Sequence, residues 1–168
     1  MQTKNMAILI FNVYWQRNIT VKLKNESQYK DLLTKAKALV SDDVDDVANM
    51  ANVSRLIMEH LPNHWIGFYR VVGQDLLLGP FNGPIACTRI GFGKGVCGKA
   101  WETRQTQLVD DVHQFPGHIA CSALSNSEIV IPCIRDGEVF AVLDIDSTEY
   151  AKFTALDKKH LEELVSYL

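Results

Sequence analysis

The chain has 168 residues, the length of a single domain, and at this size about two thirds of the unfolded surface is buried on folding. Its 17 Lys and Arg against 20 Asp and Glu give a formal net charge of −3 without a dense basic run, which argues against nucleic acid as a partner. The apolar run 7–11 is far shorter than the ~20 residues of a membrane-spanning helix, so we expect a cytoplasmic protein that does not insert into a membrane.

Two segments in the first half of the chain repeat apolar residues at helical spacing. The first spans residues 31–40, and the second runs from Val44 to about Leu61, where Pro62 ends it. We therefore predict that two helices open the domain.

The middle and the end of the chain are typical of β-strands. Aromatic and β-branched residues predict a strand over 65–72, and the clearest strands are 128–134 and 138–145. The short link Arg135-Asp136-Gly137 between the last two carries a tight hairpin signal, so we expect an antiparallel sheet. Further short strands are predicted near residues 76–78, 86–89 and 106–109.

A third helix is predicted at the C-terminus. Thr154 to Asp157 form a plausible capping box, and the apolar residues that follow share one face. Those residues are Leu161, Leu164, Val165 and Leu168. This helix can pack with the first two on one side of the sheet, which gives an α+β architecture.

The chain carries four cysteines, at positions 87, 97, 121 and 133. In a reducing compartment they should not form a permanent disulfide framework, so any bridge between them is expected to be transient and catalytic. Cys133 lies within an apolar strand and fits a buried, inert thiol. Cys121 follows a Pro/Gly loop and precedes polar Ser122 and Ser125. Burial in a strand is therefore much less expected for Cys121 than for Cys133.

The segment Gly93-Lys94-Gly95-Val96-Cys97-Gly98 matches the G-x-G-x-x-G pattern. No βαβ unit surrounds it and no P-loop triplet occurs, so dinucleotide binding is not favoured. We interpret it as a loop. Its glycines permit positive φ and close backbone approach, which suits a pocket lid or an anion-cradling turn as well as a mere connection.

Metal binding is the alternative use of the thiols. Cys87, Cys97 and Cys121, with His113 and His118, contain enough donors for zinc. There is no Cys-x-x-Cys pair, however, and the His118-x-x-Cys121 pair stands alone. We therefore favour a redox thiol set and expect no metal.

Three acids, Glu128, Asp144 and Asp146, lie next to or within apolar strands, and a period of two places Asp144 and Asp146 on one face. They could face a pocket, where burial and like charge raise one pKa and allow a carboxyl to donate a proton. Alternatively, residues 144–147 simply leave the sheet and are solvated. The pattern alone does not decide between the two.

Trp65 and Tyr69 lie four residues apart on one predicted strand and therefore share a face. An aromatic strand of this kind more often packs in a core than lines a binding wall. The pattern alone therefore indicates two core residues.

Several segments together resemble the free methionine-(R)-sulfoxide reductases, which are stand-alone GAF domains. The resemblance covers roughly residues 32–168, and the spacings between the first three cysteines are those of the family. Residues 1–30 lie outside it and are interpreted as an N-terminal extension of uncertain structure, with residues 31–168 forming the GAF domain. The matching segments are 65–69, 78–81, 86–87, 93–98, 111–113, 115–121, 127–130 and 143–147.

The resemblance implies a fold and a role for each thiol. The fold would be an α+β GAF domain with a central antiparallel sheet and the N- and C-terminal helices packed on one side. Cys121 would be the catalytic nucleophile, and Cys87 the thiol that resolves its sulfenic acid. Cys97 would be the third family cysteine, with an accessory catalytic role.

The resemblance also implies a substrate pocket. Its acids would be Glu128 and Asp146, which also serve catalysis, together with Asp144. Trp65 and Tyr69 would face the substrate, which reverses the core interpretation. Ile119 and Ala120, just before the nucleophile, would complete the pocket.

The implied activity is thiol-dependent reduction of free L-methionine-(R)-sulfoxide to methionine through a cysteine sulfenic acid and an intramolecular disulfide. Thioredoxin would recycle the enzyme, and no metal or bound cofactor would be required. The alternative is a non-catalytic GAF module that binds a small ligand or senses oxidation. The oligomeric state stays open, with a homodimer among the alternatives.

The sequence departs from the family pattern at a few positions without losing a named catalytic group. These positions are Gly91, Ser122 and Ala141, together with the additional Cys133.

Overall fold

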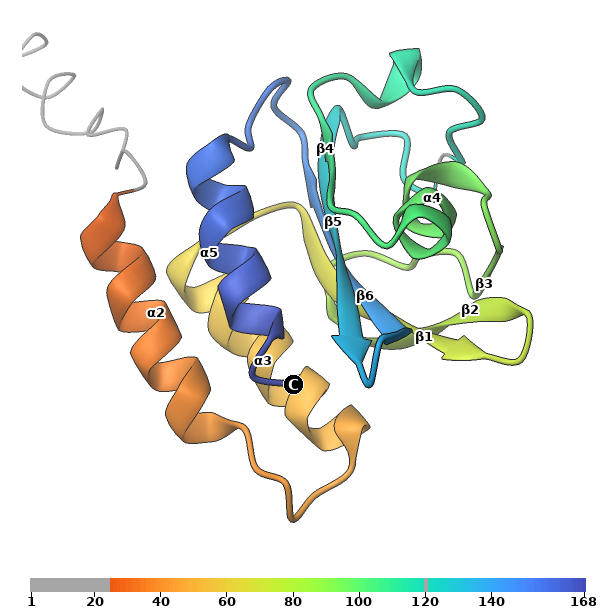
Figure 1. The fold of residues 1–168 in the computed structure, drawn as a ribbon. Helices are drawn as coiled ribbons and strands as arrows, with labels where there is room; N and C mark the ends of the chain where they lie inside the picture. Colours follow the sequence, from red (N-terminus) through yellow and green to blue (C-terminus); the bar gives the residue numbers. More distant parts are fainter. Residues whose placement is uncertain (1–24, 120) are drawn as a thin grey trace, which may run out of the picture.

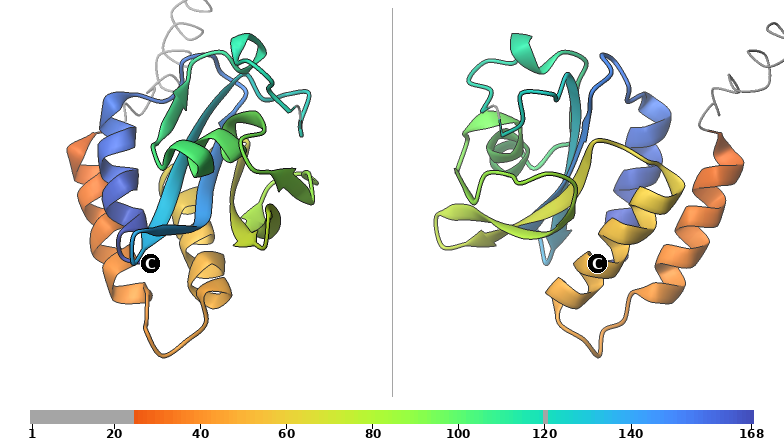
Figure 2. Two further views of the ribbon diagram at one scale, coloured as in Figure 1. Left: turned by 45° about the vertical axis from the view of Figure 1, so that its right-hand side comes forward. Right: turned by 180° about the vertical axis from the view of Figure 1, so that it is seen from behind.

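The computed structural model describes residues 25–119 and 121–168, which form a curled sheet covered by helices on both faces (Figure 1). Helices α2, α3 and α5 lie on one face, and α4 lies on the other, as the turned views in Figure 2 also show. No helix among the described residues has the length and apolar character of a membrane span. The elements are α2 Glu26–Leu39, α3 Asp46–His60, β1 Trp65–Val72, β2 Asp75–Asn82, β3 Arg89–Gly91, α4 Gly95–Thr103, β4 Gln107–Val109, η1 Val112–Gln114, β5 Ser127–Arg135, β6 Glu138–Ser147 and α5 Ala155–Val165.

The three helices on the first face begin at polar caps, and all three were predicted. The N-cap of α2 is Asn25, which forms a capping box with Gln28. The predicted box at the start of α5 is also present, between Thr154 and Asp157. Helix α2 thus begins before the predicted start of the domain at residue 31, while residues 1–24 of the expected extension lie outside the described residues.

The sheet has six strands in the order β3-β2-β1-β6-β5-β4, and every neighbouring pair is antiparallel, as predicted. The β5–β6 turn uses Asp136 and Gly137 with φ of 53° and 80°, as a tight hairpin requires. The strand predicted near 86–89 was wrong, because β3 begins only at Arg89. Residues 86–88 instead belong to the connection that carries Cys87.

Alternation along the strands gives the sheet two different faces. Ile66, Phe68 and Leu143 point towards α2, α3 and α5 and form the larger apolar core with them. Trp65 and Tyr69 point the other way, into a second cluster with α4. This second face is the one that carries the acids.

The prediction of a loop over residues 93–98 was wrong in part, because α4 begins at Gly95. A Cβ at Gly98 would lie 2.5 Å from the carbonyl oxygen of Gly91, so the glycine allows the first turn of α4 to pack on the end of β3. Glycines have low helix propensity, but tertiary packing overrides it here. The helix turns Cys97 towards the sheet, where the thiol is buried.

Candidate active site

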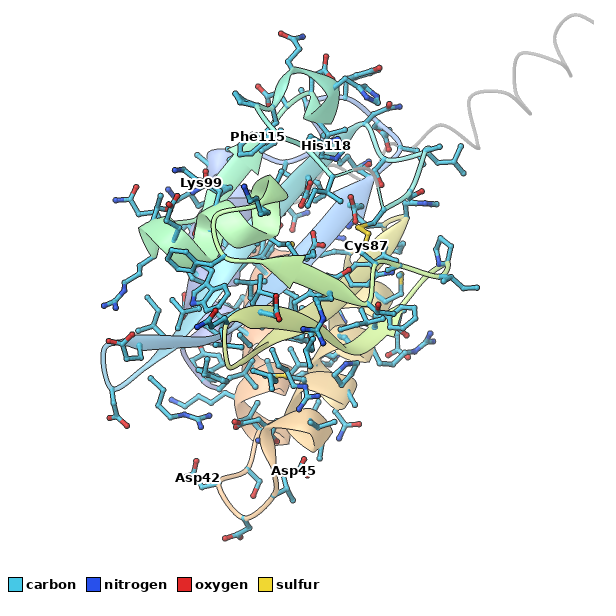
Figure 3. The ribbon with its side chains drawn as sticks, turned by 90° about the vertical axis from the view of Figure 1, so that its right-hand side faces the viewer. Asp42, Asp45, Cys87, Lys99, Phe115 and His118 are labelled. Carbon is cyan, nitrogen blue, oxygen red and sulfur yellow. A yellow bond between two sulfur atoms is a disulfide. The ribbon has the colours of Figure 1, made fainter. Side chains whose placement is uncertain are left out.

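A disulfide joins Cys87 to Cys121, although the two residues are 34 positions apart in the sequence. Their Cα atoms lie 5.3 Å apart, and both residues are half-buried. Figure 3 looks onto this face and shows the yellow bond at Cys87, with His118 on the same side of the molecule. The Tyr69 hydroxyl donates a hydrogen bond to the Cys87 carbonyl oxygen at 3.0 Å, so β1 fixes the segment that carries this thiol.

Cys121 lies in the loop between η1 and β5, outside any strand, as predicted. Its backbone N–H donates to the carbonyl oxygen of Ile119 at 2.9 Å. The next residue, Ser122, is tied to the body of the domain, because its hydroxyl lies 3.1 Å from Nε2 of His64 and forms a hydrogen bond with it. Ala120, another predicted pocket residue, lies outside the described residues.

The three predicted acids come together on the second face of the sheet. Glu128 of β5 pairs with Asp146 of β6, and Asp144 lies two positions further along the same face. Glu128 and Asp144 are each only 6% exposed. Because β6 continues to Ser147, the alternative in which residues 144–147 leave the sheet and are solvated is excluded.

Burial is the main cause of the protonation behaviour of this cluster. It raises the pKa of Glu128 and of Asp144 well above the usual range, and the negative charges of the neighbouring acids raise them further. Burial also raises the pKa of Asp146 to about 6. Raised pKa values favour the protonated form of these carboxyl groups, and a protonated carboxyl can donate its proton to an oxygen.

Cys97 approaches the acids from α4. Its Sγ donates to Oδ2 of Asp144 at 3.4 Å and to Oε1 of Glu128 at 3.9 Å, and the residue is 3% exposed. Burial raises the pKa of this thiol, and the charges of Asp144 and Glu128 raise it further. Cys97 is therefore held as a neutral thiol beside the disulfide pair rather than as a thiolate.

The two predicted aromatics are buried and also face the acids. The Trp65 and Tyr69 rings stack with centroids 5.9 Å apart, and Trp65 Nε1 donates to the Pro84 carbonyl oxygen at 3.1 Å. Both line a cavity of about 20 Å³ together with Asp144 and Cys121. The pair is thus buried, as the pattern alone indicated, and also lines a cavity, while its contact with substrate stays a prediction.

A second cavity, of about 30 Å³, also borders Cys121 and is lined by Cys97 and the three acids. Ile119 lines it, and its contact with substrate stays a prediction; Lys94 and Ser125 also line it, although they were not predicted as site residues. Nothing in their local sequence marks them, because folding of two separate loops brings them here. Both cavities are small, with room for about one water each.

The fold does not gather the zinc donors considered from the sequence. Within residues 25–119 and 121–168, one group of three side chains could hold a metal ion, formed by Cys97, Glu128 and Asp144. It contains neither His113 nor His118. The two histidines instead lie near one another, His113 in η1 and His118 in the loop after it, with ring centroids 6.4 Å apart.

Comparison with known proteins gives consistent matches over most of the chain. A family model described as a GAF domain matches residues 44–168. The chain is 47% identical over 141 residues to the free methionine-R-sulfoxide reductase of Escherichia coli (strain K12), covering 83% of this chain and 86% of that protein. It is 41% identical over 160 residues to the protein of the same name in Saccharomyces cerevisiae, covering 90% and 89%.

The fold is also similar to a solved structure. The X-ray structure of free methionine-R-sulfoxide reductase from Neisseria meningitidis in complex with its substrate superposes with a TM-score of 0.81 and 44% identity. The match covers 86% of this chain and 89% of that chain.

Proposed function

The chain belongs to the GAF domain family and, within it, to the free methionine-R-sulfoxide reductases, and on that basis we propose how its own residues reduce the sulfoxide. The substrate is free L-methionine-(R)-sulfoxide, and the oxidising equivalents pass to the Cys87–Cys121 pair. Thioredoxin, as the external dithiol, then recycles the enzyme in the cytoplasm. No metal or bound cofactor takes part in this scheme.

Substrate binding uses the acids and the aromatics of the second face. The substrate ammonium is matched by the buried carboxyl groups of Glu128 and Asp144, and a peptide-bound sulfoxide lacks that charge. Trp65 and Tyr69 hold the methyl side of the substrate. One fixed thiol and one fixed acid can address a single arrangement of groups around sulfur, which accounts for selectivity between epimers.

The first chemical step transfers oxygen from the substrate to Cys121. The Cys121 sulfur bonds to the sulfoxide sulfur while Asp146 or Glu128 protonates the sulfoxide oxygen, since that oxygen leaves sulfur only when protonated or strongly hydrogen-bonded. The new sulfur–sulfur bond then breaks as the hydroxyl passes to Cys121, and the bonding electrons stay on the methionine sulfur. The sulfoxide gains two electrons and becomes methionine. Cys121 loses two electrons and becomes a sulfenic acid.

The second step forms the disulfide seen in the structure. The Cys87 thiol attacks the Cys121 sulfenic sulfur, and the hydroxyl leaves as water. Thioredoxin reduces the bridge by two successive thiol–disulfide exchanges and is itself oxidised to a disulfide. The small cavities beside the bridge suggest that substrate enters the reduced form, in which Cys121 is not tied to Cys87.

One observation carries this proposal: a half-exposed disulfide between two distant cysteines, Cys87 and Cys121, lies next to a cluster of three acids whose pKa values are raised. Cys97 is a poorer nucleophile because its pKa is raised by burial and by the neighbouring acids. Its accessory role is to donate hydrogen bonds to those acids.

A steady-state assay separates this proposal from a non-catalytic GAF sensor. Thioredoxin-coupled turnover is followed with separate R and S epimers of free methionine sulfoxide and with an N-acetylated, C-amidated substrate. We expect turnover with the free R epimer, and a rate lower by up to ~10⁴-fold with the blocked compound, because blocking leaves buried polar groups unpaired. Comparable rates on the blocked substrate would refute a pocket that recognises the free ammonium and carboxylate. Binding of the free sulfoxide without turnover would favour a non-catalytic GAF sensor.

A further inference from the structure

Cys97, Glu128 and Asp144 form a buried group of one thiol and two carboxyls, whose nearest ligand atoms all lie within 4.8 Å of one another. We propose that this group binds a thiophilic divalent cation such as Zn²⁺, with Cys97 as the sulfur ligand and Glu128 and Asp144 as oxygen ligands. The inference does not depend on the proposed reaction, in which Cys97 makes no bond to substrate.

The distances between the donor atoms fit a tetrahedral ion. Zinc bonds of about 2.3 Å to sulfur and 2.0–2.2 Å to oxygen separate those two ligand atoms by roughly 3.5 Å. The Cys97 sulfur lies 3.4 Å from Asp144 Oδ2 and 3.9 Å from Glu128 Oε1. An ion could therefore bind between them with only small movements of three side chains.

An independent sign of an absent partner is the second oxygen of Asp144. Among the described residues, Oδ1 of this carboxyl has no hydrogen-bond partner although the side chain is only 6% exposed. A buried polar atom left unpaired costs about 1–3 kcal/mol, so such atoms usually have a ligand or water. This oxygen belongs to the same carboxyl that accepts the hydrogen bond from Cys97.

The surroundings of the group also favour a cation. In the part of the chain that the structure describes, no ion pair involves Glu128, Asp144 or Asp146. Glu128 and Asp144 are thus buried, and Asp146 half-buried, on one face without a cationic partner at salt-bridge distance, and a divalent ion would displace the protons that the two buried carboxyls hold. Because one donor is a thiol, the set suits zinc or cadmium better than magnesium or calcium, which prefer oxygen alone.

Binding exchanges protons for the ion. The Cys97 S–H bond breaks and a sulfur–metal bond forms, while the thiol proton, and any proton on the two carboxyls, passes to solvent. No electron is transferred. The cavity of about 30 Å³ lined by all three ligands leaves room for water or a group from Asp146 in the fourth position. A bound ion would occupy the acids that we assign to the substrate, so the two should exclude one another.

The oxidised protein gives a clean test, because the Cys87–Cys121 bridge removes two thiols and leaves Cys97 and Cys133 as the free ones. Cd²⁺ is titrated into this form without reductant, and the ultraviolet charge-transfer band of a cadmium–thiolate bond is recorded. We expect saturation at one ion per chain, competition by Zn²⁺ and no competition by excess Mg²⁺.

Cys133→Ser is the matched control, since Cys133 is equally buried but lies on the other face of the sheet, away from the acids. The band should persist in that variant and disappear in Cys97→Ser. Asp144→Asn and Glu128→Gln keep the thiol and should each weaken Cd²⁺ binding by at least ~10-fold, the scale of lost metal-site interactions. No band in oxidised wild type, a band that survives Cys97→Ser, or affinities unchanged in both carboxyl variants would overturn the proposal.

Discussion

The two faces of the sheet each bury a free cysteine, but in different surroundings. On the face covered by α2, α3 and α5, Cys133 packs among aliphatic side chains, and burial raises its pKa to about 12. On the opposite face, Cys97 is also buried, but it contacts Asp144 and Glu128, whose charges raise its pKa further. Burial alone therefore does not identify a functional thiol. What differs is whether acids and other thiols lie within reach.

The same strands supply both environments. In β6, Leu143 and Ile145 point into the larger core, whereas Asp144 and Asp146 point to the disulfide. A single sequence alternation thus builds a stabilising face and a reactive face. Substitutions on the first should change stability, and substitutions on the second should change turnover.

The largest difference in methionine released per chain is expected between Cys121→Ser and Cys133→Ser. Cys121→Ser should eliminate even the first turnover, because a hydroxyl lacks the nucleophilicity and the accessible pKa of a thiol. Cys133→Ser should release methionine in the same amount as wild type. Methionine released per chain without reductant is the measurement, and a wild-type yield from Cys121→Ser would remove this residue from the nucleophile role.

The next largest effect on turnover is expected from substituting the acids of the reactive face. Glu128→Gln and Asp146→Asn should each lower thioredoxin-coupled turnover by at least ~100-fold, the usual scale for losing acid–base assistance. Circular dichroism should confirm that both variants are folded. Rates within a few-fold of wild type would mean that these carboxyls neither protonate nor position the substrate.

Leu143→Ala tests the other face. Leu143 is fully buried in the larger core, so the truncation should lower the free energy of unfolding by about 2–5 kcal/mol. Methionine released per chain, measured well below the melting temperature, should stay at the wild-type level. Loss of that first turnover in a folded Leu143→Ala protein would show that the two faces are not functionally separate.

The smallest effect concerns the pH dependence of stability. The pKa of Asp146 is raised to about 6 in the folded protein from an ordinary value of 3.8, so the unfolded state loses its proton first as pH rises. Wild type should therefore lose roughly 2 kcal/mol of unfolding free energy between about pH 4 and pH 7 relative to Asp146→Asn. Urea unfolding of both oxidised proteins measures this, and parallel pH profiles would contradict the raised pKa.

The sequence predicted the stabilising face better than the reactive one. Strand β1, the β5–β6 hairpin and the cap of α5 follow from local periodicity and turn chemistry, which depend on neighbouring residues only. Helix α4 was missed because its glycines indicate a loop. A glycine is required at position 98 because the backbone of Gly91 packs too closely for a side chain, and that contact is not visible in the sequence. The short strand β3 was misplaced, since three residues at the edge of a sheet are too few to show an alternation of apolar and polar residues.

The site needed more than local pattern. Alternation placed Asp144 and Asp146 on one face, but only the fold shows that this face is covered, with Asp144 buried and Asp146 half-buried. The family resemblance implied that Cys87 and Cys121 act together, and the structure joins them. The approach of Cys97 to Asp144 and Glu128 could not be predicted, because it depends on how α4 packs on the sheet.

The central claim, that Cys121 receives the sulfoxide oxygen and Cys87 resolves it, is tested most directly by locating the sulfenic acid. Reduced Cys87→Ser is treated with one equivalent of the free R epimer in the presence of dimedone, and the adduct is mapped by mass spectrometry. We predict about one methionine per chain, an adduct on Cys121 and no recycling by thioredoxin. An adduct on Cys97, or a Cys97–Cys121 disulfide with normal recycling, would contradict this account.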